Sequence, residues 1–252
     1  MLDTRGLDQG AGLRQWATSL SPLIISMVHH GDKAAEMSAL WQICARLQRL
    51  GYPLSVLDVT AAEGQNDPGL QDMLTHSNRP QPATPESWSI IPAAIGIQHL
   101  AATLAPAETF EQALSNLFLD FGAVVIYADA DTLAGTLNLA SSYPVVPVSP
   151  DTRSLLSAYA SLKKLSLHGH AQQAALVTVR PDDSPRQISQ RIAKSLQNCT
   201  IRHLRCRLNH FDIGSSLEPE NQPDDMRQLV MHLLDRATPS GSATTTQRLW
   251  SH

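Results

Sequence analysis

Short, mostly apolar runs recur along the chain and limit the folds open to it more than any other feature. They are rich in Val, Ile and Leu, and they occupy residues 23–28, 54–59, 89–92, 123–127, 145–148 and 175–179. A strand with one wet face alternates polar and apolar residues, whereas these runs are typical of strands that are buried on both faces of a parallel sheet. The runs therefore predict an α/β protein.

Stretches with apolar residues at three- and four-residue steps lie between these runs and are typical of amphipathic helices. The expected helices cover residues 37–50, ended by Gly51, and residues 110–118, 154–167 and 224–236. A polar helix is expected around residues 185–196, and a short helix near 70–74 inside an otherwise loop-like segment, 61–88. A last strand is expected near residues 201–208. Strands that alternate with helices close into right-handed parallel crossovers, so we expect a mostly parallel central sheet flanked by helices on both faces.

The charge of the chain argues against a nucleic-acid partner. Lys and Arg number 19 against 23 Asp and Glu, a formal net charge of -4, without a basic block that would release counterions from a nucleic acid. The three cysteines are odd in number, and the start is not basic and then apolar as a signal peptide is, so we expect a cytoplasmic protein with reduced thiols. No apolar run approaches the roughly 20 residues of a membrane-spanning helix.

The loop after the first strand is where a phosphate site is expected, because ligands of open α/β sheets lie at the carboxyl ends of the strands. A phosphate loop needs glycines, a lysine for the β and γ phosphates, and a Ser or Thr for magnesium. Here Glu36 occupies the place of the lysine and Met37 that of the hydroxyl. A carboxylate repels a triphosphate and a thioether is a poor ligand for magnesium, so the loop is predicted not to bind ATP.

Several stretches together resemble the MinD/ParA-type ATPases, and among them the FlhG-type (FleN-type) flagellar-number regulators, up to about residue 217. Residues 91–100 resemble the family's Leu-Pro-Ala-Ala-Ser-Gly-Val-Gln-Glu-Leu stretch, and residues 149–163 resemble the start of a later family helix. The first strand, loop, helix and second strand are similar in length and pattern. The resemblance implies a MinD/ParA-like P-loop NTPase fold over residues 21–220.

The departures from the family fall on positions that bind nucleotide and magnesium. Four positions of the family pattern are replaced. Gly31 is in the place of the signature lysine early in the loop, and Tyr127, with Asp129 and Asp131 close by, is in the place of the aspartate that closes the Walker B strand. Of the two second-strand aspartates, Asp58 is retained and the other is replaced by Thr60, and Thr178 is in the place of an adenine-contacting asparagine. The resemblance therefore implies a pseudo-ATPase, with no catalytic residue and with ATP and magnesium binding lost.

One motif of the family that this chain does retain lies before the fold, within residues 1–20. Residues 8–14, Asp-Gln-Gly-Ala-Gly-Leu-Arg, resemble the family's Asp-Gln-Ala-x-x-Leu-Arg element, which binds the signal-recognition-type GTPase FlhF and stimulates its GTP hydrolysis. The resemblance implies that Asp8, Gln9, Leu13 and Arg14 contact such a GTPase. The two glycines weaken a free helix, so this partner-binding segment is expected to order on binding.

The end of the chain holds an amphipathic helix, within residues 221–237, and then a tail. The helix is in the place of the family's membrane-targeting helix, but its polar face has three aspartates against two arginines, so membrane contact is expected to be weak and packing on the domain is favoured. Residues 238–252 are rich in Ser, Thr and Gly and are expected to be disordered.

The first hypothesis is a non-catalytic, FlhG-like regulator of flagellar number or placement that acts on FlhF, in the cytoplasm or held by a partner at the inner membrane or cell pole. Contacts with flagellar C-ring proteins or with the flagellar transcriptional activator stay open. One alternative is a working ATPase that uses Lys33 in an unusual register, and another is a MinD-like scaffold in cellulose secretion or pilus assembly. No metal is expected, since His168 and His170 have no third ligand nearby.

Overall fold

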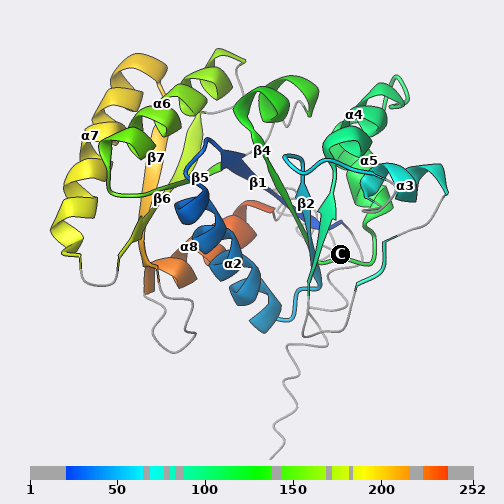
Figure 1. The fold of residues 1–252 in the computed structure, drawn as a ribbon, viewed down its shortest axis with the longest axis horizontal. Helices are drawn as coiled ribbons and strands as arrows, with labels where there is room; N and C mark the ends of the chain where they lie inside the picture. The colour runs from blue at the N-terminus through cyan, green and yellow to red at the C-terminus, as the bar shows by residue number, and fades with distance from the viewer. Residues whose placement is uncertain are drawn as a thin grey trace, which may run out of the picture.

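The structure is a computed structural model that describes residues 21–64, 69–76, 80–82, 88–137, 143–168, 172–181, 184–215 and 224–237. The elements in chain order are β1 (Leu23–His29), α2 (Lys33–Arg49), β2 (Leu54–Asp58), α3 (Leu70–Thr75), β3 (Ser89–Pro92), α4 (Ala94–Ala102), α5 (Phe110–Leu117), β4 (Ala123–Asp129), the π-helix η1 (Thr132–Thr136), β5 (Val145–Val148), α6 (Thr152–Leu167), β6 (Gln173–Arg180), α7 (Arg186–Leu204), β7 (Arg207–Gly214) and α8 (Asp224–Ala237) (Figure 1).

Within these residues the strands form one seven-stranded sheet in the order β3-β2-β4-β1-β5-β6-β7, and every neighbouring pair is parallel. This confirms the predicted parallel sheet. Strand β4 lies between β1 and β2, and its Tyr127 is level with Met27 on one side and Asp58 on the other. The carboxyl ends of the three strands therefore meet at one edge, beside the loop that begins α2.

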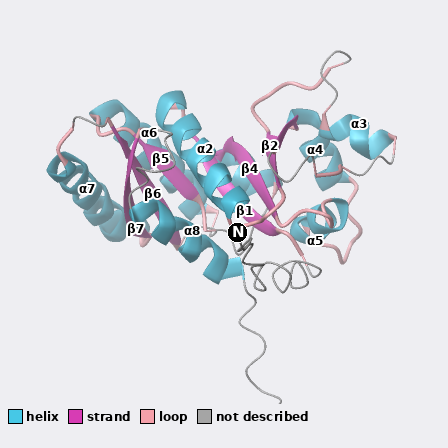
Figure 2. Cartoon of the chain, turned by 90° about the horizontal axis from the view of Figure 1, so that it is seen from below, coloured by secondary structure: helices cyan, strands magenta, loops and turns pink. Residues whose placement is uncertain are grey.

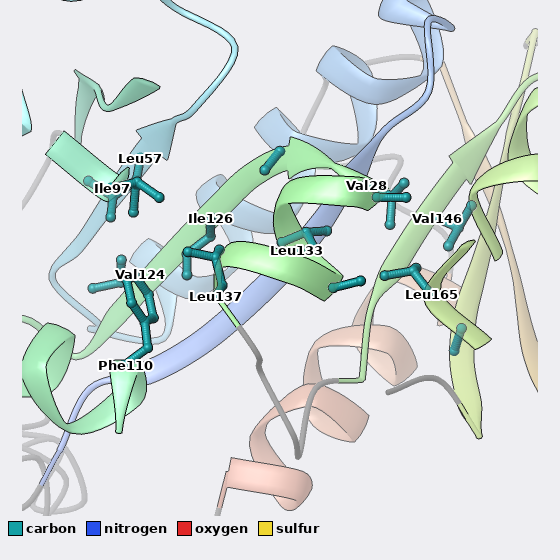
Figure 3. Packing of buried hydrophobic residues seen from close by; sticks show 14 of the residues in the cluster. Val28, Leu57, Ile97, Phe110, Val124, Ile126, Leu133, Leu137, Val146 and Leu165 are labelled. Carbon is teal, nitrogen blue, oxygen red and sulfur yellow. The ribbon is translucent and has the colours of Figure 1, made fainter. Parts of the chain in front are cut away.

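Two apolar layers enclose the sheet, as expected for strands buried on both faces. Helices α2 and α8 cover one face, where Ile43 of α2 and Val230 of α8 share a buried cluster with Val125 of β4. The other face carries a cluster to which α4, α5, η1, α6 and α7 contribute (Figure 3). Along the sheet, α3, α4 and α5 gather near β2 and β3, and α6 and α7 lie at the opposite end (Figure 1 and Figure 2).

Helix α8 packs on the domain, which was the favoured interpretation of its apolar face. Met226, Leu229 and Val230 are fully buried, and α8 contacts β1, β7 and α2. Since this apolar stripe is already covered, it is not a free membrane-binding surface. None of the helices in the described part of the chain is both long and apolar enough to cross a membrane.

Two expectations about elements need correction. The strand predicted near residues 201–208 is wrong over its first half, because α7 continues to Leu204 and ends with Arg205 in the left-handed conformation, and β7 begins only at Arg207. Polar residues in β7, among them His210 and Asp212, interrupt the apolar pattern by which the other strands were recognised in the sequence. Helix α4 was not predicted as a separate element, since the apolar residues around Gly96 have no clear helical period.

Candidate functional site

The loop between β1 and α2 folds around the carboxylate of Glu36, which is fully buried. Its Oε1 accepts hydrogen bonds from the backbone N–H groups of His30 at 2.8 Å, Gly31 at 3.0 Å and Asp32 at 3.0 Å. Gly31 has a φ of 98°, a conformation that only glycine adopts at little cost and that turns successive N–H groups toward one point. Three amides therefore converge on one oxygen, as they do on an anion in a phosphate loop.

The other carboxylate oxygen of Glu36 is held by two side chains. The Tyr127 hydroxyl donates to Oε2 at 2.5 Å, and Nδ1 of His29 lies 2.8 Å from Oε2 and 2.8 Å from the Tyr127 oxygen. Burial on its own would raise the pKa of Glu36, but the hydrogen bonds from Tyr127, the His30 backbone and His29 together lower it below its ordinary value. Glu36 is therefore a buried anion at neutral pH. Burial and the neighbouring carboxylate raise the pKa of Tyr127, which keeps its proton and remains a donor.

Two further side chains connect the same loop to β5 and to the segment that leads into α6. Asp32 caps α2 by accepting the Ala35 N–H at 3.2 Å, and its second oxygen accepts the Ser149 N–H at 2.9 Å. The buried imidazole of His30 lies with Nε2 2.5 Å from the carbonyl oxygen of Pro147. These contacts come from segments more than 100 residues away, so the loop is fixed by the whole sheet edge and not by its own sequence alone.

The structure brings several of the predicted site residues together at this edge. Asp58 ends β2 beside Tyr127, and its Oδ1 accepts from the backbone N–H and the hydroxyl of Thr60 at 2.9 and 2.7 Å. Lys33 begins α2 and is exposed, and Met37 is half-buried against the cluster beneath α2. The predicted set around Gly31 and Glu36 is therefore one contiguous site.

Three other residues singled out in the sequence have other hydrogen-bond partners, although Asp129 is level with His29 at the end of β4. Thr178 is buried on β6, two strands away from β1, with its hydroxyl 3.0 Å from Nε2 of His210. Asp129 accepts the N–H and hydroxyl of Thr132 at 2.8 and 3.0 Å and so begins η1, whereas Asp131 pairs with Lys164 of α6. None of the three has a hydrogen bond to Glu36 among the described residues. The partner-binding residues Asp8, Gln9, Leu13 and Arg14 lie outside the described residues.

A second carboxylate that caps backbone amides was missed in the sequence. Oε1 of Glu63 accepts the N–H groups of Ile95 at 2.8 Å and Gly96 at 2.6 Å, and Oε2 accepts the Gln71 N–H at 2.6 Å. One side chain thus satisfies the amino ends of α3 and α4. A lone glutamate in a loop gives no sequence signal for such a role, whereas Glu36, the fourth residue of α2, did interrupt a recognisable pattern.

No protein-family model matches the chain, and no curated protein matches it in sequence. Solved structures do match. A Cyanothece McdA variant in complex with ATP is 14% identical with a TM-score of 0.55, over 85% of this chain and 97% of that chain. Cobyrinic acid a,c-diamide synthase of Mycobacterium smegmatis with ADP and magnesium is 14% identical with a TM-score of 0.53, over 84% and 93%. The MinC:MinD complex of Aquifex aeolicus matches at 11% identity and a TM-score of 0.50, over 85% and 93%. The chain thus has a MinD/ParA-like P-loop NTPase fold.

Proposed function

We propose that this chain is a non-catalytic regulator whose phosphate loop is filled by its own Glu36. The observation that carries the proposal is the set of donors on that carboxylate: three loop N–H groups and the Tyr127 hydroxyl, all within 3.0 Å. The three backbone N–H groups are of the kind that face a phosphate in a working loop. Glu36 is an anion of this chain that takes their place.

ATP and magnesium do not fit these residues. A phosphate brought within bonding distance of the loop would meet a buried negative charge, and two like charges in a low-dielectric site repel strongly. To make room, Glu36 would have to leave the loop amides and Tyr127 together, which would leave its buried carboxylate without the donors that hold it. Met37 offers no hard oxygen ligand for magnesium.

A loop that carries its own anion has a regulatory consequence. A nucleotide shifts a protein between two states only if it binds one of them better than the other. Because Glu36 already satisfies the loop, the edge formed by β1, β2 and β4 keeps one conformation whether nucleotide is present or not. We therefore infer that this protein acts through constant protein contacts.

Isothermal titration of the full chain with ATP and magnesium tests the loss of nucleotide binding. We expect no binding at micromolar levels. Micromolar binding would overturn the proposal, and its loss in Lys33→Ala would then support the alternative of an ATPase that uses this exposed lysine. Asp120→Asn, which changes an exposed carboxylate far along the chain, serves as the matched control.

The finer part of the proposal is the partner, a signal-recognition-type GTPase of the FlhF kind in the control of flagellar number or placement. Its support is the resemblance of residues 8–14 to the family's activating element. A glutamine amide such as that of Gln9 can orient an attacking water, and Arg14 can pair with an acidic surface, without an ATP site.

Single-turnover GTP hydrolysis by FlhF with and without this protein tests the partner. We expect a faster rate with the full chain, no acceleration by a chain that lacks residues 1–20, and a reduced effect of Gln9→Ala. An FlhF rate that the full chain leaves unchanged would contradict the FlhF assignment. It would favour the MinD-like scaffold of another surface system, while the loss of ATP binding is judged by its own titration.

A further inference from the structure

The positive charges of this acidic protein are concentrated in one part of the chain. Residues 152–211 contain ten Lys and Arg but only two Asp or Glu, although the whole chain has 19 against 23. This part comprises α6, β6, α7 and most of β7, which lie together at one end of the sheet (Figure 1). The formal net charge of -4 therefore hides a strongly basic region.

The outer sides of α6 and α7, here called the α6–α7 face, carry these charges to solvent. The two helices contact each other, and each buries its inner side in the core, with Ala158 on α6 and Ala193 on α7. Neither helix contains an Asp or Glu. The exposed cations of the face are Arg153, Lys163, Lys164, Arg186, Arg191, Lys194 and Arg202. Of these, Arg191, Lys194 and Arg202 have no hydrogen-bond or ion-pair partner among the described residues, so their charges are available to a ligand.

Large aliphatic side chains are exposed on the same two helices. Leu156 and Leu167 of α6 are 66% and 75% exposed, the highest values among the exposed large apolar side chains of the described residues. Together with Lys163 they are spaced by seven and four residues, so they share one stripe of α6. On α7, Ile188 and Ile201 are 45% and 47% exposed. Cations and aliphatic side chains are thus interspersed over one surface.

We propose that the α6–α7 face binds the surface of an anionic phospholipid bilayer. Lys and Arg interact with acidic headgroups while neighbouring aliphatic side chains enter the boundary of the acyl region. A nucleic-acid backbone would pair with the cations but offer nothing to Leu156 and Leu167. A protein partner is favoured less, since protein interfaces are enriched in aromatic residues and this face exposes no large aromatic side chain among the described residues.

Flotation of the full chain with vesicles tests the proposal. Vesicles of phosphatidylcholine with phosphatidylserine are compared with vesicles of phosphatidylcholine alone, and duplex DNA is offered in a parallel mobility-shift assay. We expect binding to the acidic vesicles only. The double variant Arg191→Glu, Lys194→Glu should lower the vesicle partition coefficient at least about 20-fold, because each cation near an acidic membrane contributes on the order of a fivefold change.

Two further variants separate the contributions of apolar contact and of charge to vesicle binding. Leu156→Ser with Leu167→Ser leaves the charge unchanged and should lower vesicle binding about tenfold, which pure charge attraction would not produce. Arg49→Glu with Arg227→Glu makes the same charge change at exposed positions outside the face and should bind like the original protein. No flotation with acidic vesicles, tighter binding to duplex DNA, or an equal loss in the control variant would overturn the proposal. Thermal unfolding of each variant establishes that it is folded.

Discussion

Replacement of the Glu36 carboxylate by an amide tests what that buried anion contributes to the fold. In Glu36→Gln the side chain keeps its size, but one of its two oxygens becomes a nitrogen that cannot accept, so loop amides or the Tyr127 hydroxyl lose their partner. We expect a loss of about 2–4 kcal/mol in the free energy of unfolding, measured by urea denaturation. Asp120→Asn removes an exposed charge and should change the value by less than about 0.5 kcal/mol. A loss no larger than that of the control would contradict the buried-anion role.

The same carboxylate predicts an acid limb in the stability of the protein. Because hydrogen bonds outweigh burial and lower its pKa in the folded state, Glu36 contributes stability that is present above its unfolded pKa of about 4.5 and is lost as the pH falls below that value. Denaturation curves between neutral and acid pH should therefore show a slope that is shallower in Glu36→Gln. Identical slopes in the two proteins would mean that Glu36 is not held as the anion.

The sequence pattern located Glu36 but not its role. Its presence in a phosphate loop indicated repulsion of ATP, and the opposite interaction, with the loop's own amides, depends on the positive φ of Gly31. It also depends on Tyr127, which is 91 positions away and reaches Oε2 only because β4 pairs with β1. Contacts of that kind arise from the tertiary fold, and no local pattern encodes them.

At the scale of the element, Gly96 is required by the contact between α3 and α4. A Cβ at this position would lie 2.5 Å from the Gln71 nitrogen and 2.6 Å from the Leu70 Cβ. Alanine in a helix gains about 1 kcal/mol over glycine, but here α3 would have to move away and its shared Glu63 cap would be lost. We expect Gly96→Ala to destabilise the protein by about 2 kcal/mol or more.

Hydrogen exchange locates this effect, since the amides of α3 should exchange faster in Gly96→Ala while those of α6 should not. Gly135→Ala, in η1, is the matched control because its added Cβ meets nothing within 4 Å, and it should leave the stability unchanged or slightly higher. A stabilised Gly96→Ala variant would show that the two helices have room to separate.

The elements that were predicted best from the sequence are those whose hydrophobic pattern does not depend on contacts with other elements. Mostly apolar runs located β1, β4 and β6. Apolar residues spaced three and four positions apart located α2 and α8 within a few residues. The end of α7 was missed because its last turn, with Ile201 and Leu204, has the apolar content of a strand. Strand β7 was misplaced because its polar side chains have partners in neighbouring elements: Nε2 of His210 lies 3.0 Å from the Thr178 hydroxyl of β6, and the Asn209 amide lies 3.1 Å from His232 of α8.

The total charge of the molecule was a poor guide to the distribution of charge on its surface. A net charge of -4 and the absence of a basic run argued against a polyanionic ligand. The cations of α6 and α7, however, are spaced along two helices, and the fold places them on one side of the molecule. Helical spacing scatters such residues in the sequence, so only the arrangement of α6 over β5 and of α7 over β6 and β7 brings them together on the α6–α7 face (Figure 2).

This segregation predicts chromatographic behaviour that the net charge does not. An evenly charged protein with a sequence pI near 6.2 should pass through a cation exchanger at neutral pH. We expect this protein to be retained at low salt, where the Debye length of roughly 30 Å lets the basic face act as a unit, and to elute near 0.1 M salt, where it falls to about 10 Å. Arg191→Glu with Lys194→Glu should abolish retention, whereas Arg49→Glu with Arg227→Glu should not. Flow-through of the original protein at low salt would mean that the surrounding carboxylates neutralise the face, and the electrostatic attraction to anionic lipid would lose its basis.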